Sequence, residues 1–490
     1  MEMHIVNTTN GKVRGYERNQ MVEYLGIPYA EAPVGNRRFK RAVPKAAWEG
    51  VFDAKEYGAP PVQFHNGRVM GDEDCLTVNI QRPVEGTGLP VFVWIYGGAF
   101  STGYSSDDMY SGEAFVKDGI VFVSFNYRLN VLGFYDFTTY PGCEAMESNC
   151  GLSDQILALN WIHDNIEAFG GDPNRITIGG ESAGGSSVIN MLACPGVKGT
   201  FQQAIVESGL PNCIMTHEMA RKNIDLFMEG MHWTEEDLHH LFTDDPKLFL
   251  TGVEYVVRKH QYVNPGMFLP GPVVDDLLPV RPLEAIRNGS AQGIRLIIGT
   301  NLHEGTMFVH PENTGFPNSW TMVADMLERN KNAEGLLGIM EYYYAQQEDA
   351  FIRFATDYAF EMPSVKVAEA QKSYTPDVWM YRYELVTKSS RLSGWRASHA
   401  CELPAVFVKP DHPFTAFSFD GEAKELFDKI SNEMHGDWAA FIKHANPNDK
   451  WPRFEGAVSP VRIYDRETQT AMLDRQHMMD VWGDMRFYEG

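Results

Sequence analysis

Long apolar runs and a basic excess are both missing from this chain of 490 residues. No stretch approaches the roughly 18 uninterrupted apolar residues that a helix needs to span a bilayer. The 42 Lys and Arg residues face 65 Asp and Glu, which gives a formal net charge of −23 at pH 7. Because a nucleic-acid footprint is a basic patch, this balance argues against phosphate-backbone binding. It favours a neutral, cationic or apolar small-molecule partner.

Cysteine is also scarce. The six cysteines stand at positions 75, 143, 150, 194, 213 and 401, without a C-x-x-C pair. That is too sparse for a disulfide framework in a chain of this length. Cys143 and Cys150 are near enough in sequence for a local bridge, but free thiols in a reducing cytoplasm are favoured. The first residues, MEMHIVNTTNGKVRG, lack the basic start and apolar run of a secretory signal, so we expect a cytoplasmic location.

Signatures of metal and nucleotide chemistry are missing too. There is no H-E-x-x-H motif, and the His217-Glu218 pair is not followed by a second ligand at helical spacing. A Rossmann fingerprint and a P-loop are likewise absent. We therefore expect neither a metal nor an organic cofactor. The remaining conspicuous histidines, His239, His240 and His435, are expected on helix surfaces.

The sequence is, however, 44% hydrophobic and 12% aromatic, which is ample for a large core. It shows no repeat and no flexible linker, so residues 1–490 are expected to form a single domain. Residues 12–29 are typical of an antiparallel edge hairpin. Short apolar runs predict buried strands at 91–96, 120–127, 176–179, 204–207, 295–299 and 378–383.

Helical patterns alternate with these strands. From Ser153, taken as an N-cap, apolar residues recur at gaps of three and four until Gly170 and Pro173 end the helix. The alternation predicts an α/β fold with a large, mostly parallel central sheet flanked by helices. Segments 215–270 and 306–375 are expected to be helical cap insertions that wall a substrate pocket above the strand ends. Candidate pocket linings are Met267, Phe268, Phe360 and Met362.

The most informative stretch is the Gly180-x-Ser182-x-Gly184 motif. It lies between the β-branched run 176–179 and a segment, 186–193, that is typical of a helix. A serine on a tight strand-to-helix turn needs small neighbours because the flanking elements approach closely. The helix N-terminus behind it favours developing negative charge. This context predicts Ser182 as a nucleophile.

A second glycine-rich turn, Gly97-Gly98-Ala99, directly follows a predicted buried strand. Small residues there let backbone amides turn toward a substrate oxygen. The amides of Gly98 and Ala99, with that of Ala183, are therefore candidate donors to an oxyanion.

A serine nucleophile needs a base, and the base needs an orienting acid. In this kind of fold the chain order is serine, acid, histidine. Glu304 follows the strand at 295–299, and His399 follows the strand at 378–383, so both stand in that order at carboxyl ends of strands.

The chain resembles the type-B carboxylesterase family of α/β-hydrolases, and in particular its bacterial p-nitrobenzyl-type esterases. The matching blocks run through almost the whole length. They include Tyr24-Leu25-Gly26-Ile27-Pro28-Tyr29-Ala30, Glu73-Asp74-Cys75-Leu76-Thr77-Val78-Asn79-Ile80, Asn126-Tyr127-Arg128-Leu129, Phe169-Gly170-Gly171-Asp172-Pro173 and the Glu181-Ser182-Ala183-Gly184-Gly185 core. The Glu304-Gly305 and His399 blocks complete the set.

The resemblance implies roles residue by residue. Ser182 is the nucleophile, His399 the general base and then acid, and Glu304 the orienting carboxylate. The oxyanion donors are Gly98, Ala99 and Ala183, and Glu181 and Ser208 match family positions next to the triad. Arg38 with Glu73, and Arg128 with Asp172, match structural ion pairs.

Some positions depart from the family pattern. Secreted members pair the cysteine of the Glu-Asp-Cys-Leu block with one upstream, but Cys75 has no upstream cysteine. Segment 61–71 has no tryptophan, so the cholinesterase seat for a quaternary ammonium is not evident. Tyr96 stands where many esterases carry histidine, and Ala99 where many carry a third glycine.

These observations predict a monomeric serine carboxylesterase that hydrolyses soluble short- to medium-chain or aryl esters through an acyl-enzyme. A lipase or a phenolic-ester hydrolase of the same fold is the alternative within enzymes. A lipase would need an amphipathic lid, and the sequence shows no segment of that kind. A non-catalytic adhesion homologue is the alternative outside enzymes, and the intact set of catalytic residue types argues against it.

Overall fold

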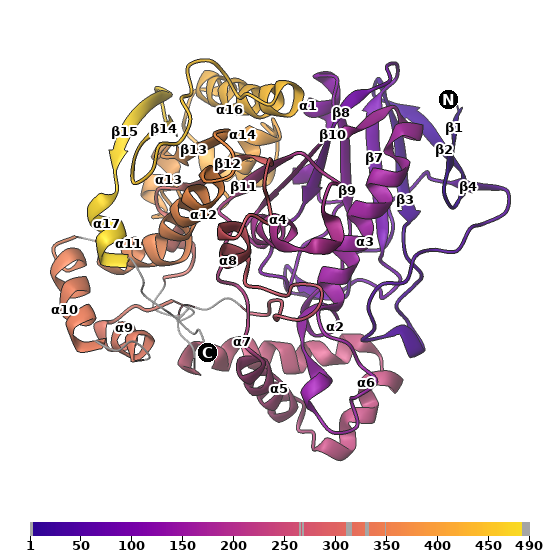
Figure 1. Ribbon diagram of the computed structural model, residues 1–490, viewed down its shortest axis with the longest axis horizontal. Coiled ribbons are helices and arrows are strands. Elements are labelled where there is room, and N and C mark those ends of the chain that lie inside the picture. Colours follow the sequence, from indigo (N-terminus) through magenta and orange to yellow (C-terminus); the bar gives the residue numbers. More distant parts are fainter. Residues whose placement is uncertain are drawn as a thin grey trace.

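The computed structural model describes residues 3–263, 266, 269–309, 316–328, 333–347 and 349–482. Within them, one 13-stranded sheet runs through the molecule in the order β1-β2-β3-β7-β9-β8-β10-β11-β12-β13-β14-β15, with β4 beside β2 (Figure 1). The strands are β1 (Met3–Thr8), β2 (Gly11–Arg18), β3 (Met21–Pro28), β4 (Val51–Asp53), β7 (Thr77–Pro83), β8 (Leu89–Ile95), β9 (Val121–Phe125), β10 (Gly171–Glu181), β11 (Gln203–Glu207), β12 (Arg295–Asn301), β13 (Val378–Tyr383), β14 (Val458–Tyr464) and β15 (Gln469–Asp474). A separate hairpin consists of β5 (Gln63–His65) and β6 (Arg68–Met70).

The centre of the sheet, from β9 to β14, is parallel, and the strands at both margins pair antiparallel, except that β4 runs parallel to β2. The predicted mostly parallel sheet is therefore confirmed. The hairpin expected over residues 12–29 is β2 and β3, with β1 outside it at the edge.

Alternate residues of the central strands enter two different cores. On β8, Val91, Val93 and Ile95 pack on one side, and Phe92 and Trp94 pack on the other. Because helices cover both faces, both sets must be apolar, which explains why these strands are continuous hydrophobic runs without alternation.

The helices divide between the two faces. The first face carries α3 (Cys150–Asn165), α4 (Ala183–Ala193), α8 (Pro282–Arg287) and α12 (Met362–Lys372), and the second carries α1 (Glu113–Lys117), α14 (Leu403–Val406) and α16 (Lys424–His444). Of these, α4 packs on β8, β10 and β11, whereas α16 packs on β8 and β10 from the opposite side. The remaining short helices are α2 (Asn130–Phe134), α11 (Ala350–Thr356), α13 (Lys388–Leu392), α15 (Pro413–Phe419) and α17 (Gln476–Trp482).

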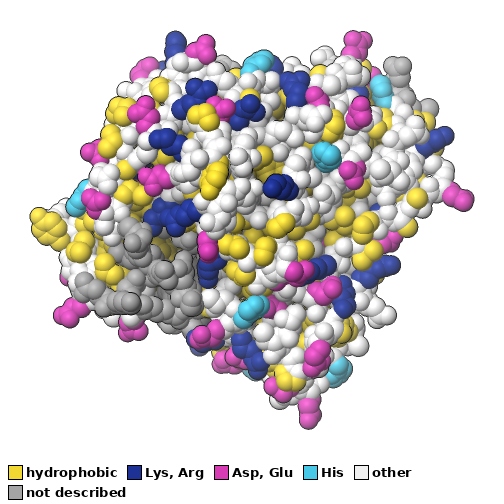
Figure 2. All heavy atoms as spheres, in the orientation of Figure 1, with side chains coloured by type: hydrophobic (Ala, Val, Ile, Leu, Met, Phe, Trp, Pro, Cys, Tyr) yellow, Lys and Arg dark blue, Asp and Glu magenta, His cyan; other side chains and the backbone are white. Residues whose placement is uncertain are grey.

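Two helical groups lie away from the sheet. In Figure 1, α5 (His217–Met231), α6 (His240–Thr243) and α7 (Leu250–Val263) gather at the bottom of the view, and α9 (Trp320–Leu327) and α10 (Ala333–Tyr344) gather at the lower left. They fall within the two segments expected to be insertions, 215–270 and 306–375, although α12, at the end of the second segment, packs on the sheet at β12 and β13. Acidic and basic side chains are interspersed on the face shown in Figure 2.

One predicted helix start is wrong. Helix α3 begins at Cys150, and Ser153 lies inside its first turn. The Ser153 hydroxyl donates to the carbonyl of Cys150 (2.6 Å) and accepts from the amide of Ala42 (2.9 Å). It therefore links the helix to an earlier loop. An N-cap serine, by contrast, would accept a hydrogen bond from an amide of its own helix.

Candidate active site

Ser182 stands at the junction of β10 and α4, in a backbone conformation that is rare for a side-chain-bearing residue (φ 57°, ψ −121°). The Ser182 amide is held by the carbonyl of Glu207, at 2.9 Å. The flanking glycines are required by space, since a Cβ on Gly184 would lie 2.0 Å from the carbonyl oxygen of Ile95. A Cβ on Gly180 would lie 2.5 Å from the backbone of Gly184. The motif thus encodes a tight turn that presents the serine at the end of the central strand.

The carboxylate of Glu304 lies where the end of β12 meets the loop after β13. Its Oε2 atom is 2.5 Å from Nδ1 of His399. Its Oε1 atom accepts from the hydroxyl of Ser208 (2.5 Å) and from the amide of Asn301 (2.7 Å). Both Glu304 and His399 are buried, at 0% and 4% exposed. The carboxylate is therefore fixed on both oxygens and holds the imidazole in one orientation.

Asn301 ties the two loops together, and sequence reasoning missed it. Its side-chain amide donates to the carbonyl of Ser398 (2.8 Å) and to Oε2 of Glu402 (2.5 Å). A second link joins the amide of His303 to the carbonyl of Ala397. The signal was a polar residue at the end of an otherwise apolar strand.

The other imidazole nitrogen faces a different carboxylate. Nε2 of His399 is 3.1 Å from Oε1 of Glu181, the residue before Ser182, although the two atoms are not aligned as a hydrogen bond. Within the described residues, no hydrogen bond joins Ser182 to His399. Hydrogen bonds of a catalytic triad are often loose without substrate and tighten in the complex.

The turn Gly97-Gly98-Ala99 packs directly against this junction. A Cβ on Gly97 would lie 2.5 Å from the carbonyl oxygen of Glu181 and 3.1 Å from Cβ of Ser182. Gly98 and Ala99 both have positive φ, at 109° and 53°. In the described part of the chain, the amides of Gly98 and Ala99 have no acceptor. The amide of Ala183 is at the first position of α4, where a helix supplies no partner.

Comparison with known proteins now decides the family. The model of the carboxylesterase family matches residues 2–482. The chain belongs to the carboxylesterase family. It is 36% identical over 483 residues to the para-nitrobenzyl esterase of Bacillus subtilis (strain 168), covering 95% of this chain and 96% of that one. It is 30% identical to the phenmedipham hydrolase of Pseudarthrobacter oxydans, covering 94% and 95%.

Solved structures agree. A structure of a PNB esterase superposes with a TM-score of 0.87 at 33% identity, covering 98% of this chain and 99% of that one. A carboxylesterase from Geobacillus stearothermophilus, solved at pH 6.2, gives a TM-score of 0.81 at 32% identity, with the same coverage. The fold is the α/β-hydrolase fold, and the protein is a carboxylic-ester hydrolase.

The carboxylesterase site is strongly acidic. Burial raises the pKa of Glu181, Glu207 and Glu402. Repulsion from a neighbouring carboxylate adds to this effect, from Glu304 for Glu181, from Glu402 for Glu207 and from Glu181 for Glu402. For His399, burial alone would lower the pKa, but the carboxylates of Glu181 and Glu304 outweigh it and raise the pKa. The site therefore favours the protonated form of His399.

Two aromatic rings flank the imidazole. The ring of Phe360 lies 4.9 Å from that of His399, and the ring of Phe308 lies 5.1 Å from it, centroid to centroid. Phe360 is one of the candidate pocket linings of the sequence analysis, and Phe308 is not among them. Met362 is buried in the core. Met267 and Phe268 lie outside the described residues.

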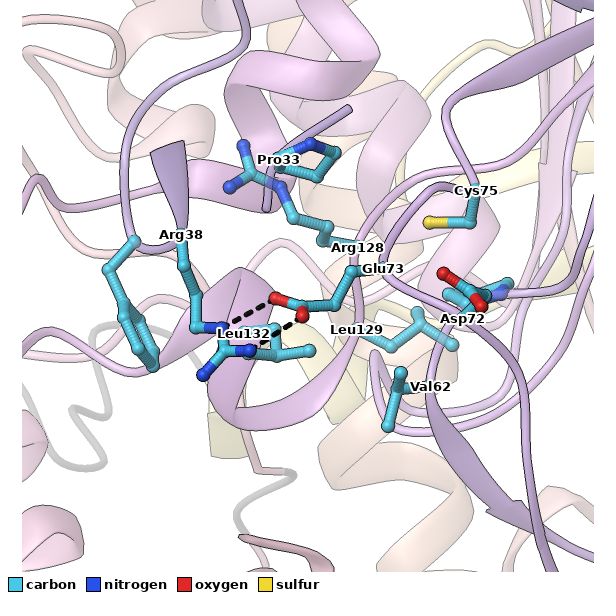
Figure 3. Close-up of a pocket in the computed structure, with 11 residues that line it drawn as sticks. Pro33, Arg38, Val62, Asp72, Glu73, Cys75, Arg128, Leu129 and Leu132 are labelled. Carbon is cyan, nitrogen blue, oxygen red and sulfur yellow. Dashed lines mark hydrogen bonds and ion pairs between the residues drawn. The ribbon is translucent and has the colours of Figure 1, made fainter. Parts of the chain in front are cut away.

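Of the two ion pairs implied by the family resemblance, one is confirmed and one is wrong. Arg38 and Glu73 form a bidentate ion pair, in which Nε and Nη2 of Arg38 donate to the two carboxylate oxygens of Glu73 at 2.6 and 2.7 Å (Figure 3). Arg128 pairs with Asp154 at 2.7 and 2.8 Å, and not with Asp172. Asp154 is one helical turn into α3, which packs beside Arg128. Asp172, at the start of β10, accepts instead from the nearby amide of Asn174.

The small cavity between Arg38 and Arg128, drawn in Figure 3, has a volume of about 10 Å³. This is room for about one water molecule, so the cavity is not a substrate site.

Among the described residues, no group of three or more His, Cys, Asp or Glu is arranged to hold a metal ion. Nor does any helix in that part of the chain have the length and hydropathy to cross a membrane.

All six cysteines are buried free thiols, so Cys143 and Cys150 are not paired. The prediction for His435 is wrong, because its side chain is buried and its Nδ1 lies 2.7 Å from the carbonyl of Val406.

Proposed function

We propose that this carboxylesterase hydrolyses soluble short- to medium-chain or aryl carboxylic esters through an acyl-enzyme formed on Ser182. The observation that carries the proposal is the 2.5 Å contact between His399 and Glu304, formed at the strand ends that also present Ser182. An imidazole held by a buried carboxylate at Nδ1 is ready to accept a proton at Nε2.

In this mechanism, Ser182 attacks the ester carbonyl carbon while His399 takes the hydroxyl proton. The amides of Gly98, Ala99 and Ala183 stabilise the oxyanion of the tetrahedral intermediate. His399 then gives the proton to the departing alcohol, which leaves the acyl group on the serine. Water repeats the sequence with His399 as base, and the carboxylic acid and free enzyme are released.

Two observations favour aryl or medium-sized esters. The rings of Phe308 and Phe360 lie beside His399 and supply an apolar, aromatic wall close to the reacting atoms. The name of the B. subtilis relative also refers to an aryl-containing ester, a para-nitrobenzyl ester. We further propose that the enzyme is a monomer of one domain and that it is cytoplasmic. Six unpaired, buried thiols support the cytoplasmic location.

The test is a series of p-nitrophenyl esters with acyl chains of two to twelve carbons. Ser182→Ala should lower kcat at least about ten-thousandfold with an unchanged circular dichroism spectrum. Ser393→Ala, at an exposed serine, is the matched control and should keep wild-type rates. A fluorophosphonate probe should add its mass to the peptide that contains Ser182.

Each other outcome has a defined meaning. A Ser182→Ala preparation with wild-type turnover overturns the proposed nucleophile. A peak at the longest chains moves the substrate class to lipids. A peak at short or medium chains supports the proposal. Light scattering of the protein as it elutes from a size-exclusion column gives its molar mass and so tests whether it is a monomer.

A further inference from the structure

The turn that carries two of the proposed oxyanion donors is strained. Gly98, Ala99 and Phe100 have φ values of 109°, 53° and 54° in succession, and two of these residues carry side chains. Left-handed conformations are unfavourable for residues with a side chain and persist only where surrounding contacts determine them. The orientation of the Gly98 and Ala99 amides therefore depends on whatever holds this turn.

The turn closes tightly on itself. The amides of Ser101 and Thr102 both donate to the carbonyl of Gly98, at 3.0 Å. A Cβ on Gly98 would lie 2.2 Å from the carbonyl oxygen of Thr102, and a Cβ on Gly103 would lie 2.6 Å from that of Gly97. Thr102 thus lies directly against Gly98, and Gly103 lies against Gly97, the residue before the donors, so a shift of Thr102 and Gly103 would move the turn.

Gln63, on strand β5, clamps Thr102 and Gly103. Its side chain is 0% exposed and makes four hydrogen bonds. Nε2 donates to the carbonyls of Pro61 and Gly103, both at 3.0 Å. Oε1 accepts from the hydroxyl of Thr102 (2.9 Å) and from the amide of Gly103 (2.8 Å). A primary amide has two donor hydrogens and about two acceptor sites, so every one of them is used.

A histidine on the same strand extends the clamp. Nδ1 of His65 lies 2.8 Å from the hydroxyl oxygen of Thr102. Because that hydroxyl donates its proton to Gln63, it accepts from Nδ1–H of His65. The hairpin β5–β6 thus fixes Thr102 from two residues, although it also exposes Phe64 and Val69 on its outer side.

We propose that Gln63 is a positioning residue for the oxyanion hole, holding the amides of Gly98 and Ala99 through Thr102 and Gly103. This inference rests on the function proposed above, in which those amides bind the oxyanion. It gives a role to segment 61–71, which has no tryptophan but supports the turn of the proposed donors from behind.

The sharp test is Gln63→Glu, which keeps the size of the side chain but turns its two donors into acceptors. The carboxylate would face the carbonyls of Pro61 and Gly103, so the clamp should open. We expect kcat on p-nitrophenyl butyrate to fall ten- to a hundredfold with KM changed less than twofold. Complete loss of one oxyanion donor costs about a hundred- to a thousandfold, which sets the upper bound. Gln292→Glu, at an exposed glutamine, is the matched control.

A second readout separates positioning from general damage. An aryl trifluoromethyl ketone, which forms an oxyanion on the serine, should bind more weakly by the same factor as kcat/KM falls. Inhibition by p-nitrobenzyl alcohol, which forms no oxyanion, should be unchanged. Thr102→Val, which removes only the hydroxyl between His65 and Gln63, should give a smaller loss of the same kind and covers the case in which Gln63→Glu does not fold.

The proposal is overturned if the folded variants keep wild-type kcat. It is also overturned if they weaken the alcohol and the ketone equally. Failure of the proposed function is a separate result, because the wild-type enzyme would then show turnover that does not depend on Ser182. Ser182-dependent turnover with a dispensable Gln63 would reject this inference alone.

Discussion

The hydroxyl of Ser208 donates a 2.5 Å hydrogen bond to Oε1 of Glu304, the carboxylate oxygen that faces away from His399. Ser208 directly follows β11, and its positive φ of 49° aims the side chain across the strand ends. The acid of the proposed triad is thus held from a third strand, which neither the acid nor the histidine occupies.

Removing this hydroxyl tests its contribution. Ser208→Ala leaves Glu304 with the amide of Asn301 as its remaining partner on Oε1. Hydrogen bonds to charged groups contribute about 1.5–3 kcal/mol, so kcat/KM should fall roughly ten- to a hundredfold. Steady-state rates on p-nitrophenyl butyrate measure this loss in kcat/KM, and the melting temperature checks that the variant is folded. A rate within twofold of wild type would show that the Asn301 amide suffices.

The charge of Glu181 should set the acidic limb of the pH–rate profile. The carboxylates of Glu181 and Glu304 outweigh burial and raise the pKa of His399. Since the histidine must be neutral to act as base, activity rises as pH increases through that pKa. Glu181→Gln removes one of the two charges, lowers the pKa of His399 and moves the limb to lower pH. A limb at an unchanged pH would mean that Glu181 is uncharged in the free enzyme.

Because Arg128 pairs with Asp154, substitution of Asp154 should lower the free energy of unfolding much more than substitution of Asp172. Asp154 is fully buried and accepts three hydrogen bonds from Arg128, so Asp154→Asn leaves a buried guanidinium without its counter-charge. We expect a loss of about 3–5 kcal/mol in the free energy of unfolding. Asp172→Asn should change it by less than about 0.5 kcal/mol. Urea unfolding of both variants compares them, and equal losses would contradict the pairing.

A cluster around Glu361 should make stability depend on pH. Burial alone would raise the pKa of Glu361, but Arg353, Arg475 and Arg382 outweigh it and lower the pKa well below its ordinary 4.5. A carboxyl group with a lowered pKa stabilises the fold above its ordinary pKa, and this contribution is lost as pH falls.

Glu361→Gln should therefore lower the melting temperature most near neutral pH, and the difference from wild type should shrink below about pH 4. At neutral pH the loss should be about 3 kcal/mol, because Arg475 is almost fully buried. Glu113→Gln, which breaks only an exposed pair with Lys117, is the control and should have little effect. A pH-independent difference would point to lost packing.

Much of the fold followed from local patterns. The buried strands and the strand-to-helix turn at Ser182 were predictable because apolar runs, spacing and small residues act within a few residues of one another. The two strands predicted before Glu304 and His399 are β12 and β13 of the structure. That the two residues meet at 2.5 Å is a property of the folded chain, since 95 residues separate them.

The errors have the same origin. The pair of Arg128 with Asp172 was implied by the family resemblance, but the partner of a buried charge is set by which helix packs beside it, and α3 brings Asp154 there. Ser153 has the residue type of an N-cap, yet its contact with the amide of Ala42 depends on a loop more than a hundred residues away. His435 lies on a helix whose exposure no local pattern reveals.

By itself, the sequence determined the tight turn at Ser182 and the glycine-rich turn at Gly97–Ala99, because those depend on local backbone geometry. Only the tertiary structure decided that Ser208 and Asn301 hold Glu304, that Glu181 faces the free nitrogen of His399, and that Gln63 clamps the turn of Gly98 and Ala99. These contacts join segments far apart in the chain. Their strength comes from burial, which removes competing water and so makes each distant partner necessary.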